Sequence, residues 1–387
     1  MKMKLCRGFA AVLVLMMLYC VNAAAIEPSE AAPPVQIAAK AAVLMDASTG
    51  KMLVKFNENQ RLYPASVTKV MTLLLVAEAL ESGKLKLGDQ VSASSAAASK
   101  GGSQIWLKEG ETMTVEELLK AAAIYSANDA CCALGEAIAG SEEGFVRLMN
   151  ERAKALGMEN TVFVNCTGLD DETTEHLTTA YDIALMSRAL LQHGIVIKYS
   201  TIWMDSLRDG ATELVNTNRL VRFYEGATGI KTGTTSKAGC CISASAKRGE
   251  THLIAVVLGS GSSDDRFETA KRLLNWGFAN YATVTPQIAP ALITPVRVVR
   301  GVQQWVRPVP PAAMPILVPK GSEGDLQQSV DLAVDVQAPV EAGQALGKIT
   351  ITLDGETLGV YPLTAPEAVP KLDFVTQLRR LAGALVG

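Results

Sequence analysis

The order of strand-like and helical patterns over residues 40–283 constrains the fold of this chain more than any other feature. Two apolar runs flank the Gly-containing segment 46–50, which predicts a β-hairpin. Near the other end, strand-like runs at 239–246 and 253–258 precede a closing helix predicted over 266–280. Strands from both ends of the region therefore predict one sheet with a helical insertion, which is a mixed α/β fold.

Helical periodicity fills the segment between these strands. Apolar residues recur at helical spacing from Val70 to Leu80, and Gly83 supplies a stop. Further helices are predicted over residues 115–125, 130–139, 143–156 and 180–192. The insertion is therefore predicted to be mostly helical.

The N-terminus has the pattern of an export signal. Three basic residues within the first seven positions precede an apolar run over 9–21 and then small residues, so residues 1–25 are predicted to be a cleavable signal peptide. The apolar run is shorter than the about 20 residues of a membrane-spanning helix, although a retained anchor is the alternative. Residues 26–39 show no periodicity and are predicted to be a leader.

Charge and composition exclude several classes of protein. The chain of 387 residues has a formal net charge of −3, and removal of three basic residues with the signal gives −3 − 3 = −6. An exported, mildly acidic chain is not a dedicated nucleic-acid binder. A hydrophobic content of 49% also excludes wholesale disorder.

Five cysteines remain after cleavage, namely Cys131, Cys132, Cys166, Cys240 and Cys241. An odd number cannot all pair, and neighbouring cysteines do not readily bridge each other. Their spacing fits no zinc-binding pattern. They are predicted to be small buried residues with no metal site and no assigned role.

Two further regions follow residue 283. Residues 284–368 are proline-rich and alternate in polarity, with Asp354-Gly355 as a tight turn, so they are predicted to form a small all-β domain. Residues 369–387 are predicted to form an amphipathic helix, because Phe374, Leu378, Leu381 and Leu385 share one face. The helix can anchor the protein peripherally to a membrane surface or dock on its own chain.

Three short motifs stand in order along the chain, Ser66-Val67-Thr68-Lys69, Ser126-Ala127-Asn128 and Lys231-Thr232-Gly233. Each is weak alone, and the three together are strong. Ser66 lies in the first turn of the long helix, whose N–H groups favour an oxyanion. Lys69 lies one turn further along the same face, and a partly buried lysine near other cations has a lowered pKa and can accept the serine proton. The chain has three histidines, none in a nucleophile-elbow context, so a Ser-His-Asp triad is not predicted.

The other two motifs can have purely structural roles instead of functional ones. Ser126 and Asn128 can relay a proton and hold a substrate amide, or simply cap a helix. Lys231 and Thr232 can attract a carboxylate next to a strand that pairs with an extended peptide. Alternatively, Lys231 is a solvated residue before a tight turn.

These motifs identify a family resemblance. The chain resembles the D-alanyl-D-alanine carboxypeptidases of the low-molecular-mass penicillin-binding proteins, and the three motifs in this order are typical of penicillin-binding proteins and class A β-lactamases. The likeness also includes 165–169, 176–182, Thr234, Arg266, the β-domain and the amphipathic tail. It implies a β-lactamase/transpeptidase-like domain with an antiparallel sheet over 40–283.

The resemblance implies a role for each motif residue. Ser66 is the acylated nucleophile, Lys69 its base and Ser126 the proton relay. Substrate-binding residues are Asn128, Lys231, Thr232, Gly233, Thr234 and Arg266, with the N–H groups of Ser66 and Thr234 as oxyanion hole. No cofactor and no metal is implied.

The implied substrate is a peptidoglycan stem pentapeptide ending in D-Ala-D-Ala, whose trimming limits crosslinking, and β-lactams are the implied inhibitors. The implied location is the extracytoplasmic face of the cell membrane. Three alternatives remain. A class A β-lactamase needs a Glu-x-x-Leu-Asn element, absent between Asn128 and Lys231, where Glu172 and Glu175 lack the following Leu-Asn. A D,D-endopeptidase of crosslinks and a non-catalytic scaffold remain open.

Overall fold

The computed structural model describes residues 33–171 and 173–374 of the chain. The predicted signal peptide, the first part of the predicted leader and the predicted tail helix beyond residue 374 lie outside the described residues. Within the described ranges, no helix is long and apolar enough to cross a membrane.

A five-stranded sheet organises the N-terminal region, with the strand order β2-β1-β9-β8-β7. All neighbouring strands in it are antiparallel. The strands are β1 (Ala41–Asp46), β2 (Met52–Phe56), β7 (Ala227–Thr235), β8 (Gly239–Arg248) and β9 (Thr251–Ser260). The predicted hairpin is confirmed as β1 and β2, and strands from both ends of the region share one sheet as predicted. Strand β7 was not predicted, and it forms one edge.

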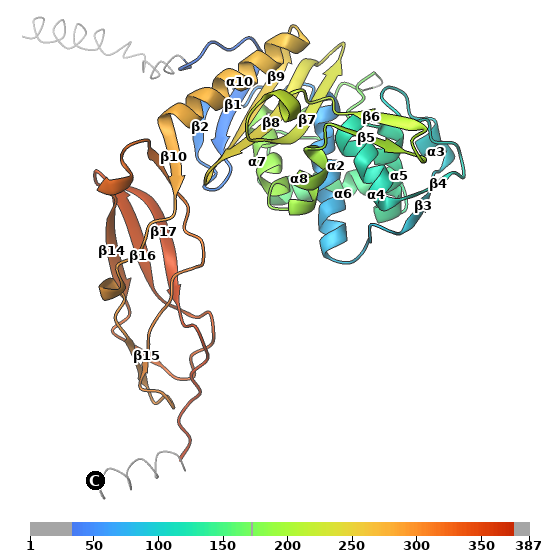
Figure 1. The fold of residues 1–387 in the computed structure, drawn as a ribbon. Helices are drawn as coiled ribbons and strands as arrows, with labels where there is room; N and C mark the ends of the chain where they lie inside the picture. Colours follow the sequence, from blue (N-terminus) through green and yellow to red (C-terminus); the bar gives the residue numbers. More distant parts are fainter. Residues whose placement is uncertain (1–32, 172, 375–387) are drawn as a thin grey trace, which may run out of the picture. The chain divides into compact units, whose positions relative to one another are not determined.

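Helices cover both faces of this sheet (Figure 1). Helix α10 (Ser263–Asn280) packs on β8 and β9 on one face, and helices α2 (Lys69–Glu81) and α7 (Ala180–Leu190) contribute to the core on the other. Successive strand residues enter opposite cores, as with Val43 and its neighbour Leu44. A sheet buried on both faces explains why its strands are almost continuously apolar.

The insertion between β2 and β7 is mostly helical, as predicted. Its other helices are η1 (Ala65–Thr68), α3 (Ser95–Ala98), α4 (Val115–Lys120), η2 (Ala121–Tyr125), α5 (Asn128–Ala139), α6 (Glu142–Ala155), α8 (Gly194–Ser200) and α9 (Leu220–Phe223). Two small two-stranded sheets that no periodicity predicted pair β3 (Gln90–Ser92) with β4 (Thr112–Thr114) and β5 (Met204–Leu207) with β6 (Thr212–Val215). The predicted helix over 115–125 changes to a π-helical turn in its second half.

The residues from Tyr281 onward form the predicted all-β domain. Its three sheets have the orders β10-β13, β12-β11-β15 and β14-β16-β17. The strands are β10 (Tyr281–Val284), β11 (Val296–Val299), β12 (Trp305–Val306), β13 (Ile316–Pro319), β14 (Gln327–Leu332), β15 (Asp335–Gln337), β16 (Ala345–Leu353) and β17 (Glu356–Thr364), with short 3-10 turns at η3 (Pro290–Leu292) and η4 (Glu323–Asp325). Asp354 and Gly355 have φ of 50° and 83°, the positive values that a tight hairpin turn requires, so the predicted turn is confirmed.

Two segment ends differ from the prediction. Side chains within 35–39 pack against the core under α10, so ordered packing begins before residue 40. Val369 is fully buried and bridges to Val340, and the Leu372 N–H donates to the Arg300 carbonyl at 2.7 Å. The start of the predicted tail helix therefore belongs to the β-domain.

Candidate active site

Ser66 lies in a strained turn between Pro64 and helix α2. Ala65 has a φ of 49°, in the left-handed region, which costs a non-glycine residue about 1–2 kcal/mol. Ser66 itself lies in the 3-10 turn η1, and not in the first α-helical turn. Backbone strain of this kind often accompanies functional sites, because the surrounding structure holds a side chain in one orientation.

Lys69 lies against the Ser66 hydroxyl. Its Nζ donates to Ser66 Oγ at 2.8 Å and to the Thr167 carbonyl at 2.8 Å. The side chain is 0% exposed, and burial lowers the pKa of Lys69, while nearby acidic groups act in the opposite direction. Loss of water is therefore the principal cause of the shift, as the predicted partial burial of Lys69 implied, and the neighbouring cations that were also expected to contribute are not among its causes.

Ser126 and Asn128 enter the site from the break between η2 and α5. Ser126 has a φ of 70°, and its Oγ is buried with no hydrogen-bond partner among the described residues. Asn128 donates through Nδ2 to the Gly101 carbonyl at 2.7 Å, while its Oδ1 is buried and unpaired. Helix α5 has no side-chain cap, so the capping alternative is wrong. Two buried oxygens without a partner among the described residues are costly, which leaves both available to a ligand or an ordered water.

Lys231 and Thr232 lie within edge strand β7, where the motif was expected to precede a strand. Lys231 is 1% exposed, so its reading as a solvated residue is wrong. Burial first, then the charge of Lys69, lowers the pKa of Lys231 well below its usual value. Thr232 Oγ1 donates to Thr217 Oγ1 at 2.7 Å, which orients the threonine side chain.

Arg266 reaches the same strand from helix α10. Its Nη1 donates to the Gly233 carbonyl at 3.0 Å and to Thr234 Oγ1 at 2.9 Å. Its Nε is buried without a partner. Arg266 therefore fixes the end of β7 and adds a cation to a site that already contains Lys69 and Lys231.

Gly233 lies directly over the Ser66 backbone. A Cβ placed on Gly233 would stand 2.7 Å from the Ser66 nitrogen and 2.9 Å from the Pro64 carbonyl oxygen. Only a residue without a side chain allows this approach. The structure therefore brings the third motif against the turn of Ser66, while helix α2 packs against η2 and α5, the elements that flank the second motif.

His176, the histidine nearest the site, does not form a triad. Its Nδ1 accepts the Val164 N–H at 3.1 Å, so the ring proton lies on Nε2, which contacts Thr68 Oγ1 at 2.8 Å. Burial, with a contribution from Lys69, lowers the pKa of His176 to about 4. His176 is thus a neutral structural residue.

Sequence reasoning assigned no role to three residues that hold the site. The Thr167 carbonyl orients Lys69, Thr217 orients Thr232, and the buried Asp129 carboxylate accepts the N–H groups of Ile105 and Leu107. Asp129 stood next to the second motif, which was the available signal for it. Thr167 and Thr217 carried none, because they act across long sequence separations.

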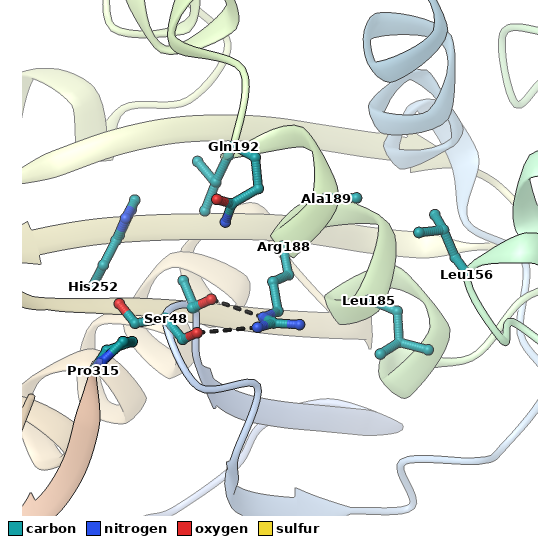
Figure 2. A pocket seen from close by; sticks show the side chains of 10 residues that line it. Ser48, Leu156, Leu185, Arg188, Ala189, Gln192, His252 and Pro315 are labelled. Carbon is teal, nitrogen blue, oxygen red and sulfur yellow. Dashed lines mark hydrogen bonds between the residues drawn. The ribbon is translucent and has the colours of Figure 1, made fainter. Parts of the chain in front are cut away.

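A cavity of about 470 Å³ lies beside Arg188, and Pro315 of the β-domain is among its lining residues (Figure 2). Arg188 lies on α7 and donates to the carbonyls of Ala47 and Ser48 at 2.8 and 3.0 Å, so its guanidinium ties the helix to the β1–β2 turn. None of the three motifs lines this cavity. Its role in the fold is therefore separate from the site at Ser66.

Comparison with known proteins agrees with this geometry. The family model described as D-alanyl-D-alanine carboxypeptidase matches residues 27–262, and that described as penicillin-binding protein 5, C-terminal domain matches 281–371. The chain is 43% identical to D-alanyl-D-alanine carboxypeptidase DacF of Bacillus subtilis over 349 residues, 89% of each chain.

Two solved structures share the fold. The chain resembles penicillin-binding protein 5 of Haemophilus influenzae with a TM-score of 0.75 and 32% identity, covering 87% of this chain and 99% of that one. Penicillin-binding protein D2 of Listeria monocytogenes in its cefotaxime-bound form gives a TM-score of 0.59 and 31% identity, covering 64% of this chain and 99% of that one. The chain therefore belongs to the D-alanyl-D-alanine carboxypeptidase family of penicillin-binding serine peptidases.

Proposed function

We propose that the protein removes the terminal D-alanine from peptidoglycan stem pentapeptides through an acyl-enzyme on Ser66, and thereby limits crosslinking. The observation that carries the proposal is the buried Lys69 amine, 2.8 Å from Ser66 Oγ. A neutral amine at that position can take the hydroxyl proton as Oγ attacks the penultimate D-alanine carbonyl. The relatives named as carboxypeptidases support this substrate class.

The remaining motif residues complete the chemistry. The N–H groups of Ser66 and Thr234 would stabilise the tetrahedral oxyanion, because Gly233 lets strand β7 pass close to the Ser66 backbone. Ser126 Oγ has no other partner, so it can pass a proton to the leaving D-alanine amine. Water then hydrolyses the ester, and Ser66 regains its proton.

Other residues of the site would bind an amide group and the terminal carboxylate of the substrate. The Asn128 Oδ1 can accept an amide N–H of the peptide, since it has no partner in the structure. Lys231 and Arg266 offer positive charges to the terminal carboxylate, and Thr232 offers a hydroxyl. Edge strand β7 suits an extended peptide backbone.

Release of D-alanine from a soluble pentapeptide tests the proposal, together with intact-mass spectra after penicillin treatment. We expect D-alanine release and a penicillin adduct with the wild type, and neither with Ser66→Ala. An adduct that persists in Ser66→Ala would remove Ser66 from the mechanism. Cleavage of crosslinked dimers without pentapeptide trimming would favour the endopeptidase, and no cleavage of either would favour the scaffold.

Slow release of the penicillin adduct would argue against a β-lactamase. That activity needs a carboxylate that activates water at the ester, and Glu175, one of the two candidates, is exposed. Rapid adduct turnover with release of penicilloate would contradict the carboxypeptidase assignment.

The location and the domain division belong to the same proposal. We infer that the protein acts on the extracytoplasmic face of the membrane, held there by the C-terminal amphipathic segment. The sequence pattern of 1–25 and of the tail supports this. The division into a catalytic domain over 40–283 and a β-domain over 284–368 remains a prediction.

A further inference from the structure

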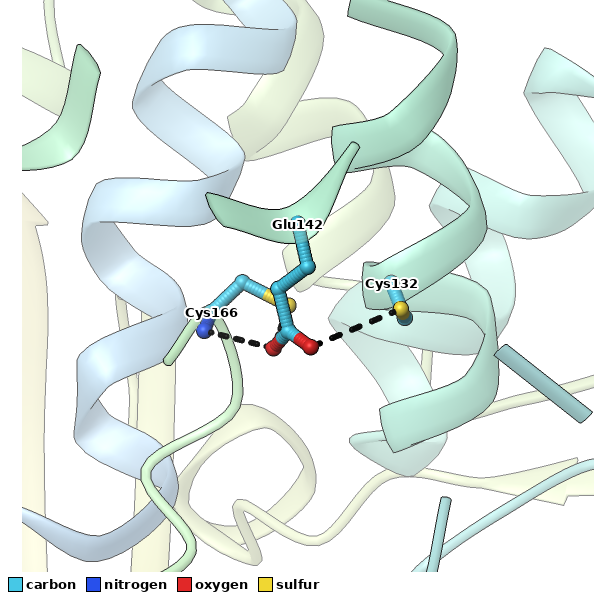
Figure 3. A group of neighbouring side chains, drawn as sticks. All are labelled: Cys132, Glu142 and Cys166. Atoms are coloured by element: carbon cyan, nitrogen blue, oxygen red, sulfur yellow. Dashed lines mark hydrogen bonds between the residues drawn. The ribbon is translucent and has the colours of Figure 1, made fainter. Parts of the chain in front are cut away.

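Three side chains that can bind a metal and that the proposed mechanism does not use lie close together (Figure 3). Cys132 lies on α5, Glu142 is the first residue of α6, and Cys166 lies in the segment that leads to Thr167. Their two sulfurs and one carboxylate oxygen all lie within 4.8 Å of one another. The spacing along the chain gave no sign of this, since 10 positions separate Cys132 from Glu142 and 24 separate Glu142 from Cys166.

The distances suit a tetrahedral metal ion. Cys166 Sγ lies 3.2 Å from Glu142 Oε1, and Cys132 Sγ lies 3.9 Å from Glu142 Oε2. Around Zn²⁺, with bonds of about 2.3 Å to sulfur and 2.0 Å to oxygen, a sulfur and an oxygen stand about 3.5 Å apart. The two observed distances, one to each carboxylate oxygen, bracket that separation, so small side-chain rotations can bring both sulfurs within range of one oxygen.

The charges balance as well. The Lys100 ammonium forms an ion pair with Glu142 Oε2, which leaves two neutral thiols and a neutral ion pair. Binding of a divalent ion forms two metal–sulfur bonds and releases the two thiol protons to solvent. The sum of two thiolates, the Glu142 carboxylate, the Lys100 ammonium and one divalent ion is again zero, so metal binding leaves the net charge of these groups unchanged. Glu136, whose Oε1 lies 3.7 Å from Cys132 Sγ, adds a half-buried carboxylate both with and without the metal.

We propose that Cys132, Cys166 and Glu142 bind one Zn²⁺-class ion, with water as the fourth ligand. Thiolates select borderline and soft metals and reject Mg²⁺. Both cysteines are fully buried, whereas the side chains of Glu142 and Lys100 are 16% and 22% exposed, which provides an entry route from the surface.

Metal binding at this site would affect the position of Lys69 beside Ser66. The Cys166 carbonyl accepts Thr72 Oγ1 at 2.7 Å, and the next carbonyl, that of Thr167, accepts Lys69 Nζ at 2.8 Å. A metal bound to Cys166 therefore holds the segment that orients Lys69. We expect the metal-loaded protein to be acylated faster by penicillin than the metal-free protein. This consequence rests on the proposed function, whereas metal binding itself does not.

Titration of the chelator-stripped, reduced protein with Co²⁺ tests the site. We expect one ion per chain, with the ultraviolet thiolate-to-metal band of cysteine ligation, displacement by Zn²⁺ and no displacement by Mg²⁺. Cys132→Ser, Cys166→Ser and Glu142→Gln should each weaken binding by at least about 100-fold, more than loss of an outer-shell partner. Cys240→Ser is the matched control and should bind like the wild type.

Penicillin adduct formation by each variant checks that it is folded. Absence of a thiolate band in the folded wild type would overturn the site, and so would full binding by the folded Cys132→Ser and Cys166→Ser variants. A disulfide between Cys132 and Cys166, detected as a mass lower by two hydrogens before reduction, would replace the metal site by a redox pair. Metal binding with an unchanged acylation rate would reject the coupling to Lys69.

Discussion

The catalytic region and the β-domain bury different kinds of side chain. In the catalytic region Lys69, Asp129 and Lys231 are almost fully buried, and Ser126 and Asn128 carry buried unpaired oxygens. Over the described residues 281–374, the buried side chains are apolar except for Thr283, whose hydroxyl donates to Asp46 Oδ2 at 2.8 Å. Burying a charge or an unpaired polar group costs several kcal/mol, so one region gives up stability to hold a reactive site. The other follows only the rules of core packing.

Replacement of Lys69 should have the largest effect on activity, and it tests whether burial of this amine costs stability. Lys69→Met should lower acylation by about 10²–10⁴-fold, because the base is lost. Its stability should be equal to or above that of the wild type, since a methionine needs no water in that position. Penicillin acylation kinetics and chemical denaturation measure the two effects.

Exposed Lys84 provides the control. Lys84→Met should leave both quantities unchanged. Marked destabilisation by Lys69→Met would show that the buried amine stabilises the fold, and that the catalytic region does not give up stability to hold it.

Closing the space under strand β7 should have a similar but smaller effect. Gly233→Ala places a carbon 2.7 Å from the Ser66 nitrogen, so the strand must move away from the oxyanion position. We expect acylation to fall by about 10²–10³-fold, the cost of a lost oxyanion donor. Gly88→Ala, with nothing within 4 Å of its Cβ, is the matched control. Equal rates for the two variants would rule out the close approach.

Acid should weaken the catalytic region alone. Burial lowers the pKa of His176 and of His252 from 6.5 to about 4. Their contribution to stability is present above about pH 6.5 and is lost as the pH falls towards 4, because the unfolded chain then binds more protons. Each group accounts for on the order of 3 kcal/mol.

The β-domain contains no histidine, so it serves as an internal control. Hydrogen exchange should show protection falling in the catalytic sheet between pH 6.5 and 4. Equal loss of protection in β16 and β17 would contradict this assignment.

A substitution that creates a cavity in the β-domain should lower stability without lowering activity. Ile351 is fully buried in its core, and Ile351→Ala should cost about 2–5 kcal/mol in unfolding of that domain. Turnover of a soluble pentapeptide should be unchanged. Val360→Ala, at an exposed position on the neighbouring strand, should have little effect on either. A loss of turnover in Ile351→Ala would show that the two regions are energetically coupled.

Removal of the tail should have the smallest effect on the enzyme. Since the chain is hydrogen-bonded to the β-domain through Leu372, truncation belongs after Phe374. We expect the truncated protein to move from the membrane to the soluble fraction with unchanged turnover. Undiminished membrane association would favour the tail as a helix docked on its own protein.

Sequence patterns predicted the helices and the hairpin whose formation depends mainly on residues close in the sequence. Helices α2, α6, α7 and α10 follow from apolar periodicity, and the β1–β2 hairpin follows from its turn. Strand β7 escaped detection because Gly229 and Gly233 interrupt its pattern, and its identity as a strand depends on pairing with β8. The π-helical turn before Ser126 was equally hidden, because the apolar residues of 121–125 suit an α-helix as well as a π-helix.

By itself, the sequence determined the chemical parts of this protein: three ordered motifs, a shortage of histidine that disfavoured a triad, and the pattern of an α/β region followed by a β-domain. Only the tertiary structure decided what those parts can do. Burial lowers the pKa of Lys69, Gly168 and Gly233 allow backbone to approach the Ser66 turn, and distant Cys132 and Cys166 meet at Glu142. The physical reason is that solvation, close contact and ligand geometry depend on neighbours in space, and a sequence specifies these only through the completed fold.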